Sequence, residues 1–439
     1  MLRCGRLFTI VSSVLLSIAF SVLLVQGCSS VGVTNPTPTP TPVPTNATTI
    51  KHIVVIMQEN RTVDNLFNGF PGADTVLTGI QKGKTITLQP IPLEQGTDAL
   101  HTHLDWVADY DNGLLDNFDH LPSTDPVANF PYAYVPRSET VPYWTLAQAY
   151  TFGDRMFQSN TGPSFVAHQY MIAGQSGNSS ENPTYFPWGC DAPNGTTVAL
   201  IGPNGTDLPG VFPCFDYQTI ADVLDAKGIT WKYYAPALGS DQWAAWSAFQ
   251  AIHHIRYGPD WTANVISPAP QVLTDIAAGK LAQVTWIVPS MAYSDHAYPT
   301  ATAEGPDWVA NIVNAIGGSQ FWDSTVIFIS WDDWGGWYDH VVPPQIDNMG
   351  YGFRVPLIIV SPYAKHGYVS HQVHEFSGFL KYTEEVFQLP NLGQRDVNAD
   401  DFADCFDYTQ TPAPYTQVPV TFKPSFFLFT KDNSPPDND

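Results

Sequence analysis

Basic residues are scarce in this 439-residue chain. Lys and Arg total 18 against 41 Asp and Glu, which gives a formal net charge of -23. Binding of nucleic acid depends on Lys and Arg that neutralise phosphates and release counterions. The composition therefore argues against a nucleic-acid partner. Small phosphate-containing substrates are not excluded, because a bound metal ion can supply the local positive charge that the surface lacks.

Cysteine is also rare, with five residues and no Cys/His spacing typical of a zinc site. Cys190 and Cys214 lie beside proline and aromatic residues in a loop-rich region, and in an oxidising compartment we expect them to pair. In the chain-entropy model, a bond that closes a loop of this length stabilises the fold by about 3.5 kcal/mol. Cys405 is then unpaired, and we expect a buried thiol.

Long hydrophobic runs are confined to the N-terminus. Residues 7–25 are apolar and follow Arg3 and Arg6, which is typical of a secretion signal. The leader ends in VQGCSS, which resembles the cleavage box of bacterial lipoproteins and predicts lipid attachment at Cys28. The alternative is an uncleaved anchor, since a membrane span needs about 20 apolar residues. Both interpretations place the protein outside the cytoplasm, lipid-anchored in the cell envelope or secreted.

Four segments divide the chain. The signal peptide at 1–28 is followed by a linker at 29–49, where the run TPTPTPVPT predicts an extended tether. A folded domain is expected over residues 50–430, with a polar tail at 431–439.

The folded domain opens with HIVVIMQENRTVDNLF at residues 52–67. Residues 53–57 are apolar and rich in β-branched types, which predicts a buried strand. Glu59 and Asn60 follow this run after Gln58, and Thr62 is suited to cap a helix. Open α/β sheets bind ligands at the carboxyl ends of their strands, and a carboxylate next to an amide at that place can hold a cation.

A second polar pair follows another apolar run. Residues 325–330 predict a buried strand that ends in WDDWGGWYDHV, with Asp332 and Asp333 directly after it. If the two strands are neighbours, the two pairs meet at one crevice, and three close carboxylates require a cation or protons. Gly335 and Gly336 allow a close approach of backbone.

Further strands are predicted at 283–288 and 354–360, with helical stretches between the strands. Strands separated by helices pair in parallel. The sequence therefore predicts an α/β fold, a three-layer sandwich with a mostly parallel central sheet flanked by helices.

Hydroxyl and imidazole side chains provide further candidates. Ser164 follows a Gly-Pro turn at the start of a predicted helix, where a hydroxyl serves as a helix cap or as a nucleophile. Thr161 lies in the same turn. Two histidines in an extended HTH segment are expected to point the same way, and an acid and a histidine follow the strand at 283–288; these are His101, His103, Asp295 and His296.

The motifs occur together, in this order, in one known family. HIVVIMQENRTVDNLF, the HTH segment, GPSFVAHQY, SDHAYP, WDDWGGWYDHV and RVPLIIVSPYAKHG resemble those of the phosphoesterase family of bacterial phospholipases C, plant non-specific phospholipases C and a bacterial acid phosphatase. The resemblance extends over about residues 50–390. It implies an alkaline-phosphatase-like fold and identifies residues 50–430 as the catalytic domain with insertions.

The resemblance also implies roles for single residues. The metal ligands would be Glu59, Asn60, Asp332 and Asp333, and the catalytic residues Ser164, His296 and His103. Second-tier candidates are His101 as an alternative to His103, Thr161 as an alternative nucleophile, Asp295 and His340. The chain departs from the family pattern after Ser164, where Phe-Val-Ala-His replaces x-Pro-Asn-Arg, and after His296, where the proline is displaced.

The resemblance implies an exported phosphoric ester hydrolase that binds one divalent metal ion and acts through a phosphoserine intermediate. The identity of the metal stays open among Ca, Mg, Mn, Fe and Zn. The family members with the most similar motifs are the phospholipases C, so the expected substrate is a phosphate ester, with phospholipid first. The alternatives are an acid phosphatase acting on soluble monoesters and an envelope binding protein without catalysis.

Overall fold

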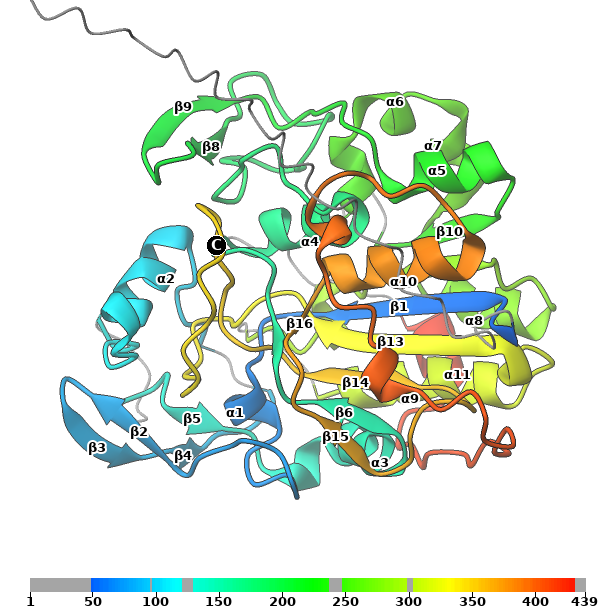
Figure 1. Cartoon of the computed structure of the whole chain (residues 1–439), viewed down its shortest axis with the longest axis horizontal. Helices are drawn as coiled ribbons and strands as arrows, with labels where there is room; N and C mark the ends of the chain where they lie inside the picture. Colours follow the sequence, from blue (N-terminus) through cyan, green and yellow to red (C-terminus); the bar gives the residue numbers. More distant parts are fainter. Residues whose placement is uncertain (1–48, 95–96, 121–128, 237–246, 298–302, 431–439) are drawn as a thin grey trace, which may run out of the picture. The chain divides into compact units, whose positions relative to one another are not determined.

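The computed structural model describes residues 49–94, 97–120, 129–236, 247–297 and 303–430 (Figure 1). The predicted signal peptide, the lipid-attachment residue Cys28, the linker up to residue 48 and the tail at 431–439 lie outside the described residues. Within the described part of the chain, no helix is both long enough and apolar enough to cross a membrane.

An eight-stranded sheet forms the centre of the described domain, in the order β11-β10-β12-β1-β13-β14-β6-β15 (Figure 1). Most neighbouring strands are parallel, as predicted, but β14 is antiparallel to both β13 and β6. The bounds of the strands in chain order are β1 His52–Gln58, β6 Thr151–Gly153, β10 Trp231–Tyr234, β11 Val265–Ile266, β12 Val284–Ile287, β13 Thr325–Trp331, β14 Leu357–Val360 and β15 Tyr368–Ser370.

The two strands that carry the polar pairs are neighbours. β1 and β13 pair in parallel over their full length, from His52 opposite Thr325 to Gln58 opposite Trp331. Every residue of β13 is buried, as are all residues of β1 except His52. The apolar runs therefore form central strands. Because these strands are parallel, the residues that follow them lie together at the carboxyl end of the sheet.

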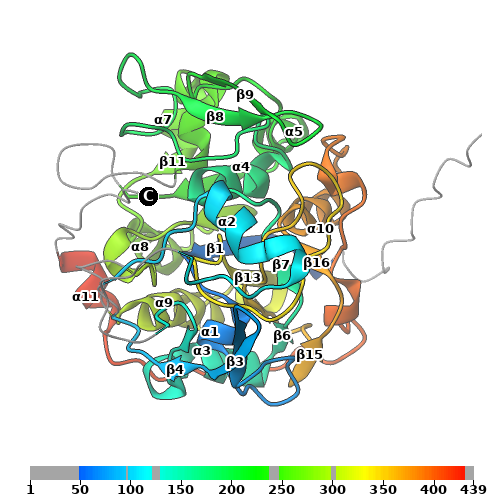
Figure 2. The same ribbon diagram turned by 90° about the vertical axis from the view of Figure 1, so that its left-hand side faces the viewer.

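Helices cover both faces of the sheet (Figures 1 and 2). On one face, Phe328 of β13 lies 5.2 Å from Phe379, measured between ring centroids. On the opposite face, Trp331 lies 5.0 Å from Tyr143. The arrangement is the predicted three-layer sandwich. The first face holds α4 (Ser164–Ala173) and α10 (Ser377–Phe387), and the second holds α3 (Val141–Ala149) and α9 (Gly305–Gly317).

Short elements surround the three layers. β2 and β3 form an antiparallel hairpin, and Thr62 caps α1, as predicted, by accepting a hydrogen bond from the Asn65 N–H at 3.0 Å. The remaining elements are β2 Thr78–Gln81, β3 Lys84–Thr87, β4 Gln89–Pro90, β5 Ala133–Tyr134, β7 Met156–Phe157, β8 Val198–Ile201, β9 Asp207–Val211, β16 His374–Glu375, α1 Val63–Leu66, α2 His103–Tyr110, α5 Ile220–Lys227, α6 His253–Arg256, α7 Pro259–Asn264, α8 Gln271–Ala277 and α11 Pro424–Phe429.

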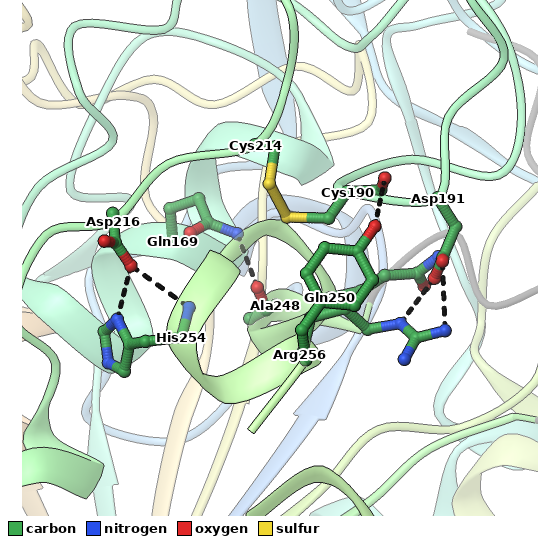
Figure 3. The surroundings of a disulfide bond; sticks show 10 residues. Gln169, Cys190, Asp191, Cys214, Asp216, Ala248, Gln250, His254 and Arg256 are labelled. Atoms are coloured by element: carbon green, nitrogen blue, oxygen red, sulfur yellow. Dashed lines mark hydrogen bonds and ion pairs between the residues drawn. A yellow bond between two sulfur atoms is a disulfide. The ribbon is translucent and has the colours of Figure 1, made fainter.

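A disulfide joins Cys190 and Cys214 in the loop-rich segment between α4 and α5, and Cys405 is a buried free thiol (Figure 3). Helix α4 is tied to a segment beside this bond, because the Gln169 side chain donates to the Ala248 carbonyl at 3.0 Å. The disulfide region therefore packs against the helix that begins with Ser164.

Candidate active site

The two polar pairs meet where β1 and β13 end. The Asn60 N–H donates to the Asp332 carboxylate at 3.0 Å, and the Asp333 N–H donates to the same oxygen at 2.8 Å. Glu59, Asn60, Asp332 and Asp333 are all fully buried. Two backbone N–H groups thus hold Oδ1 of Asp332 in place, and Oδ2 takes no part in these two hydrogen bonds.

Two glycines allow three loops to converge at this cluster. A Cβ atom on Gly335 would lie 2.5 Å from the Asn60 carbonyl oxygen, and one on Gly336 would lie 2.6 Å from Ala99 Cβ. Both glycines have positive φ, at 59° and 71°. Any other residue would push apart the loops that follow β1 and β13 and the segment before α2.

His101 orients the amide of Asn60. The Asn60 amide N–H donates to His101 Nε2 at 2.7 Å, while His101 Nδ1–H donates to the Ala99 carbonyl at 2.7 Å. This tautomer makes Nε2 an acceptor, so the amide nitrogen faces the ring and the amide oxygen Oδ1 faces the other way. His101 therefore contacts a presumed metal ligand.

The predicted nucleophile lies beside the cluster. Ser164 is the first residue of α4, and its hydroxyl lies 3.5 Å from a Glu59 carboxylate oxygen and 3.4 Å from an Asp333 oxygen. Thr161 is directed elsewhere, since its hydroxyl lies 2.9 Å from His103 Nδ1. Burial lowers the pKa of His103.

The two histidines of the HTH segment do not point the same way. His101 precedes α2 and contacts Asn60, whereas His103 is the first residue of α2 and contacts Thr161. The expectation of an extended segment was wrong because Thr102 and Asp105 form a capping box, which starts a helix at His103.

His168 is a site residue that the sequence interpretation missed. It lies one turn after Ser164 on the same face of α4, and its Nε2 is 3.2 Å from Glu59 and 3.7 Å from Asp332. Burial lowers the pKa of His168 to about 4. The spacing of four residues from Ser164 was the available signal, but a single histidine on an apolar helix is more often part of the core.

His296 packs against His101, the residue that contacts Asn60, and their ring centroids are 5.8 Å apart. Its Nδ1–H donates to the Ala297 carbonyl at 3.0 Å, so in the neutral ring Nε2 carries the free lone pair. Asp295 instead holds the loop in place, because its carboxylate accepts hydrogen bonds from Tyr143 at 2.7 Å and Trp331 at 3.0 Å. Burial raises the pKa of Asp295.

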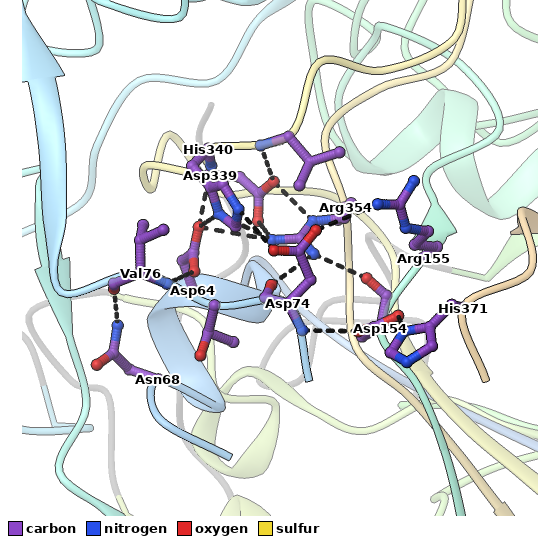
Figure 4. Close-up of polar contacts among 12 residues, drawn as sticks. Asp64, Asn68, Asp74, Val76, Asp154, Arg155, Asp339, His340, Arg354 and His371 are labelled. Atoms are coloured by element: carbon purple, nitrogen blue, oxygen red, sulfur yellow. Dashed lines mark hydrogen bonds and ion pairs between the residues drawn. The ribbon is translucent and has the colours of Figure 1, made fainter. Parts of the chain in front are cut away.

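His340 belongs to a different cluster (Figure 4). Its ring nitrogens lie 2.6 Å from Asp64 and 3.1 Å from Asp74. The guanidinium of Arg354 donates to Asp339 at 2.8 and 3.0 Å and lies 3.5 Å from Asp64. The positive charge of Arg354 thus neutralises these acids. Because Arg354 belongs to the RVP motif and Asp339 to the GGWYDHV motif, the two motifs form one ion-pair network.

The cluster at Glu59 fits a metal ion. Asn60 Oδ1 and Asp332 Oδ2 are buried and accept no hydrogen bond from the described residues. One ligand atom each from Glu59, His168 and Asp332 lie within 4.8 Å of one another. Buried carboxylates with unused lone pairs are costly unless a cation is bound, so the residues fit a divalent ion.

A cavity of about 610 Å³ lies beside the C-terminal end of α4 and is lined by Tyr170, Tyr351, Glu375 and Arg395 among others. None of its lining residues belongs to the cluster around Glu59. We therefore do not assign this cavity to the chemistry.

Comparison with known proteins identifies relatives over most of the chain. The chain is 24% identical over 451 residues to the non-hemolytic phospholipase C of Burkholderia pseudomallei, covering 85% of this chain and 61% of that protein. It is 26% identical over 443 residues to the hemolytic phospholipase C of Pseudomonas aeruginosa, covering 84% and 58%. Phospholipase C B of Mycobacterium tuberculosis is 24% identical over 445 residues, covering 84% and 79%. The chain thus spans about three fifths of the length of the first two relatives.

Among solved structures, a protein in the alkaline phosphatase superfamily from Vibrio parahaemolyticus matches with a TM-score of 0.38 and 11% identity, covering 80% of this chain and 70% of that one. The model of the Phosphoesterase family matches residues 50–390. This match covers most of the chain and includes both polar pairs, the Ser164 turn and the ion-pair network. The chain therefore belongs to the Phosphoesterase family.

Proposed function

We propose that this protein is a metal-dependent phosphoric ester hydrolase, most like a phospholipase C, in which Ser164 attacks phosphorus. The observation that carries the proposal is the position of the Ser164 hydroxyl, 3.4 and 3.5 Å from carboxylates of two presumed metal ligands. The ligands are Glu59, Asn60, Asp332 and Asp333. The three related proteins named above are all called phospholipase C, which supports the reaction class.

A divalent ion bound there supplies Lewis acidity, which lowers the pKa of a nearby hydroxyl and neutralises charge on the phosphoryl oxygens. The Ser164 hydroxyl loses its proton to solvent, and its oxygen attacks phosphorus in line with the leaving alcohol. The N-terminus of α4 favours the negative charge that develops. His296 gives a proton to the leaving oxygen. Water then attacks the phosphoserine and restores the hydroxyl.

Thr161 is the competing nucleophile. Its hydroxyl is within hydrogen-bond distance of His103, but it is not bonded to a presumed metal ligand in the described part of the chain. We therefore assign the attack on phosphorus to Ser164. The hydrogen bond between His103 and Thr161 holds the turn that precedes Ser164 in place.

The variant Ser164→Ala tests the nucleophile. We expect hydrolysis to fall by at least about a thousandfold, because covalent catalysis is lost, while metal content measured by mass spectrometry stays at the wild-type level. Thr161→Val is the matched comparison and should lose far less activity than Ser164→Ala, because Thr161 only positions the turn. Full activity in Ser164→Ala would disprove the assignment.

The substrate class is tested by comparing phosphatidylcholine with p-nitrophenyl phosphate. Release of phosphocholine and diacylglycerol supports the phospholipase C proposal. Turnover of the soluble monoester alone would make the protein an acid phosphatase, and turnover of no phosphate ester would favour the envelope binding protein.

We also propose export and lipid attachment at Cys28, on the basis of the leader sequence. Metabolic labelling with a radioactive fatty acid should mark the wild-type protein and leave Cys28→Ala unlabelled.

A further inference from the structure

His168 brings a nitrogen donor to the cluster of presumed oxygen ligands. Its ring is 1% exposed, and its Nε2 lies 3.2 Å from Glu59 Oε1 and 3.7 Å from Asp332 Oδ2. The Asp332 oxygen accepts no hydrogen bond from the described residues. The imidazole is therefore directed at the same small space as two carboxylate oxygens.

The imidazole does not act as a base for the nucleophile. The hydroxyl of Ser164 is within hydrogen-bond distance of Glu59 and Asp333, and both of these partners are carboxylates. His168 instead lies one helical turn further along α4, beside Glu59 and Asp332. Helix α4 thus presents a hydroxyl and an imidazole to different sides of the same acidic cluster.

We infer that His168 is a nitrogen ligand of the cation held by Glu59, Asn60, Asp332 and Asp333, and that it biases the site toward a borderline transition ion such as Zn²⁺ or Fe²⁺ over Mg²⁺ and Ca²⁺. The inference rests on the metal site of the proposed function. Imidazole suits Zn and Fe, whereas sites made of oxygen ligands alone suit Mg and Ca.

The strength of this ligand is moderate. Ligating histidines usually donate their second N–H to an acceptor that fixes the ring, but Nδ1 of His168 has no hydrogen-bond partner among the described residues. Loss of His168 should therefore weaken Zn²⁺ binding by about tenfold, which is the lower end of the range for outer residues that orient a metal ligand. Mg²⁺ binding should change less than about twofold.

Pulsed EPR of the full chain loaded with less than one equivalent of Mn²⁺ tests direct coordination. We expect a ¹⁴N hyperfine coupling in the wild-type protein, its loss in His168→Gln, and its retention in His103→Gln, the matched control that contacts Thr161. Titration calorimetry with Zn²⁺ and Mg²⁺ should give the fold-changes stated above. His168→Asn serves if the Gln variant does not fold.

Each contrary result has one meaning. A ¹⁴N coupling that persists in His168→Gln, or that is absent from Mn²⁺-loaded wild type, would overturn the inference and leave His168 as a hydrogen-bond donor to Glu59. Failure of the wild type to bind any of these ions would instead overturn the metal site of the proposed function. Hydrolysis by metal-free protein would also overturn the metal site of the proposed function.

Discussion

At the scale of single residues, the site depends on the orientation of side chains as much as on their identity. Asn60 is useful as a ligand only when its oxygen, and not its nitrogen, faces the carboxylates. The hydrogen bond from its amide nitrogen to His101 selects that orientation, and the bond from His101 to the Ala99 carbonyl selects the tautomer. The family motif of Glu followed by Asn therefore acts together with a histidine that lies 41 residues away in sequence.

We predict that His101→Leu weakens metal binding by about tenfold to a hundredfold, because the Asn60 amide is then free to rotate. His101→Gln is the matched control, since its side-chain oxygen can still accept from the Asn60 amide, and it should recover part of the affinity. Titration calorimetry with Zn²⁺ measures both. Wild-type affinity in the Leu variant would show that His101 does not orient the ligand.

Much of the site could be predicted from the sequence, since Glu59 and Asp332 each follow an unbroken apolar run and such runs form adjacent central strands. His168 could not be predicted in the same way. Most of its neighbours on α4 are apolar, so the local pattern is that of a core helix, and only the tertiary contact between α4 and the end of β1 brings the ring to Glu59. The roles of Asp295 and His340 were equally hidden, because their partners come from distant segments.

At the scale of elements, the direction of β14 shows a limit of sequence patterns. Its apolar run predicts a strand correctly, but the chain between β13 and β14 contains no helix, and a parallel connection normally needs one. The strand consequently returns antiparallel to β13. β6, with only three residues, has no pattern long enough to predict.

Helix α2 offers a prediction about pH, because His120 bonds two of its acids. The ring nitrogens of His120 lie 3.2 Å from Asp109 and 2.9 Å from Asp105, and the bond to Asp109 is the main cause that raises the pKa of His120 to about 9. A pKa raised above the unfolded value of 6.5 adds stability that is full below pH 6.5 and lost as the pH rises through 9.

The variant His120→Gln should therefore lower the free energy of unfolding by about 1 kcal/mol near neutral pH, after allowing for solvent screening of a partly exposed ring. The difference from wild type should shrink toward zero above pH 9. Urea unfolding at about pH 6.5 and about pH 10 measures the difference in the free energy of unfolding between wild type and variant at each pH. A gap that is the same at both values would contradict an ionic role for His120.

At the scale of the whole molecule, two buried groups of acids among the described residues are neutralised in different ways. The group at Glu59 fits a metal ion, whereas the group at Asp339 is neutralised by Arg354. Although acids outnumber bases in the sequence, the charges of the acids at Asp339 are compensated locally by Arg354. Arg354 also donates to the backbone carbonyls of Asp74 and Asp154, both at 2.9 Å, so one side chain joins four distant segments (Figure 4).

Removal of this guanidinium should be costly. Arg354 and Asp339 are both fully buried, so Arg354→Met leaves an unpaired carboxylate in the interior, and we expect a loss of about 3 to 5 kcal/mol in the free energy of unfolding. Lys82→Met is the matched control: its ion pair with Asp119 spans 3.7 Å and its side chain is 61% exposed, so it should cost about 0 to 1 kcal/mol. Urea unfolding at neutral pH compares the two.

The double variant Arg354→Met with Asp339→Leu separates charge from structure. If the penalty is that of an unpaired carboxylate, removal of both partners should recover much of the stability lost in Arg354→Met. If the double variant is as unstable as the single one, the guanidinium acts mainly through the carbonyls of Asp74 and Asp154. Metal binding at Glu59 should persist in every variant that folds, because Arg354 neutralises the other group of acids.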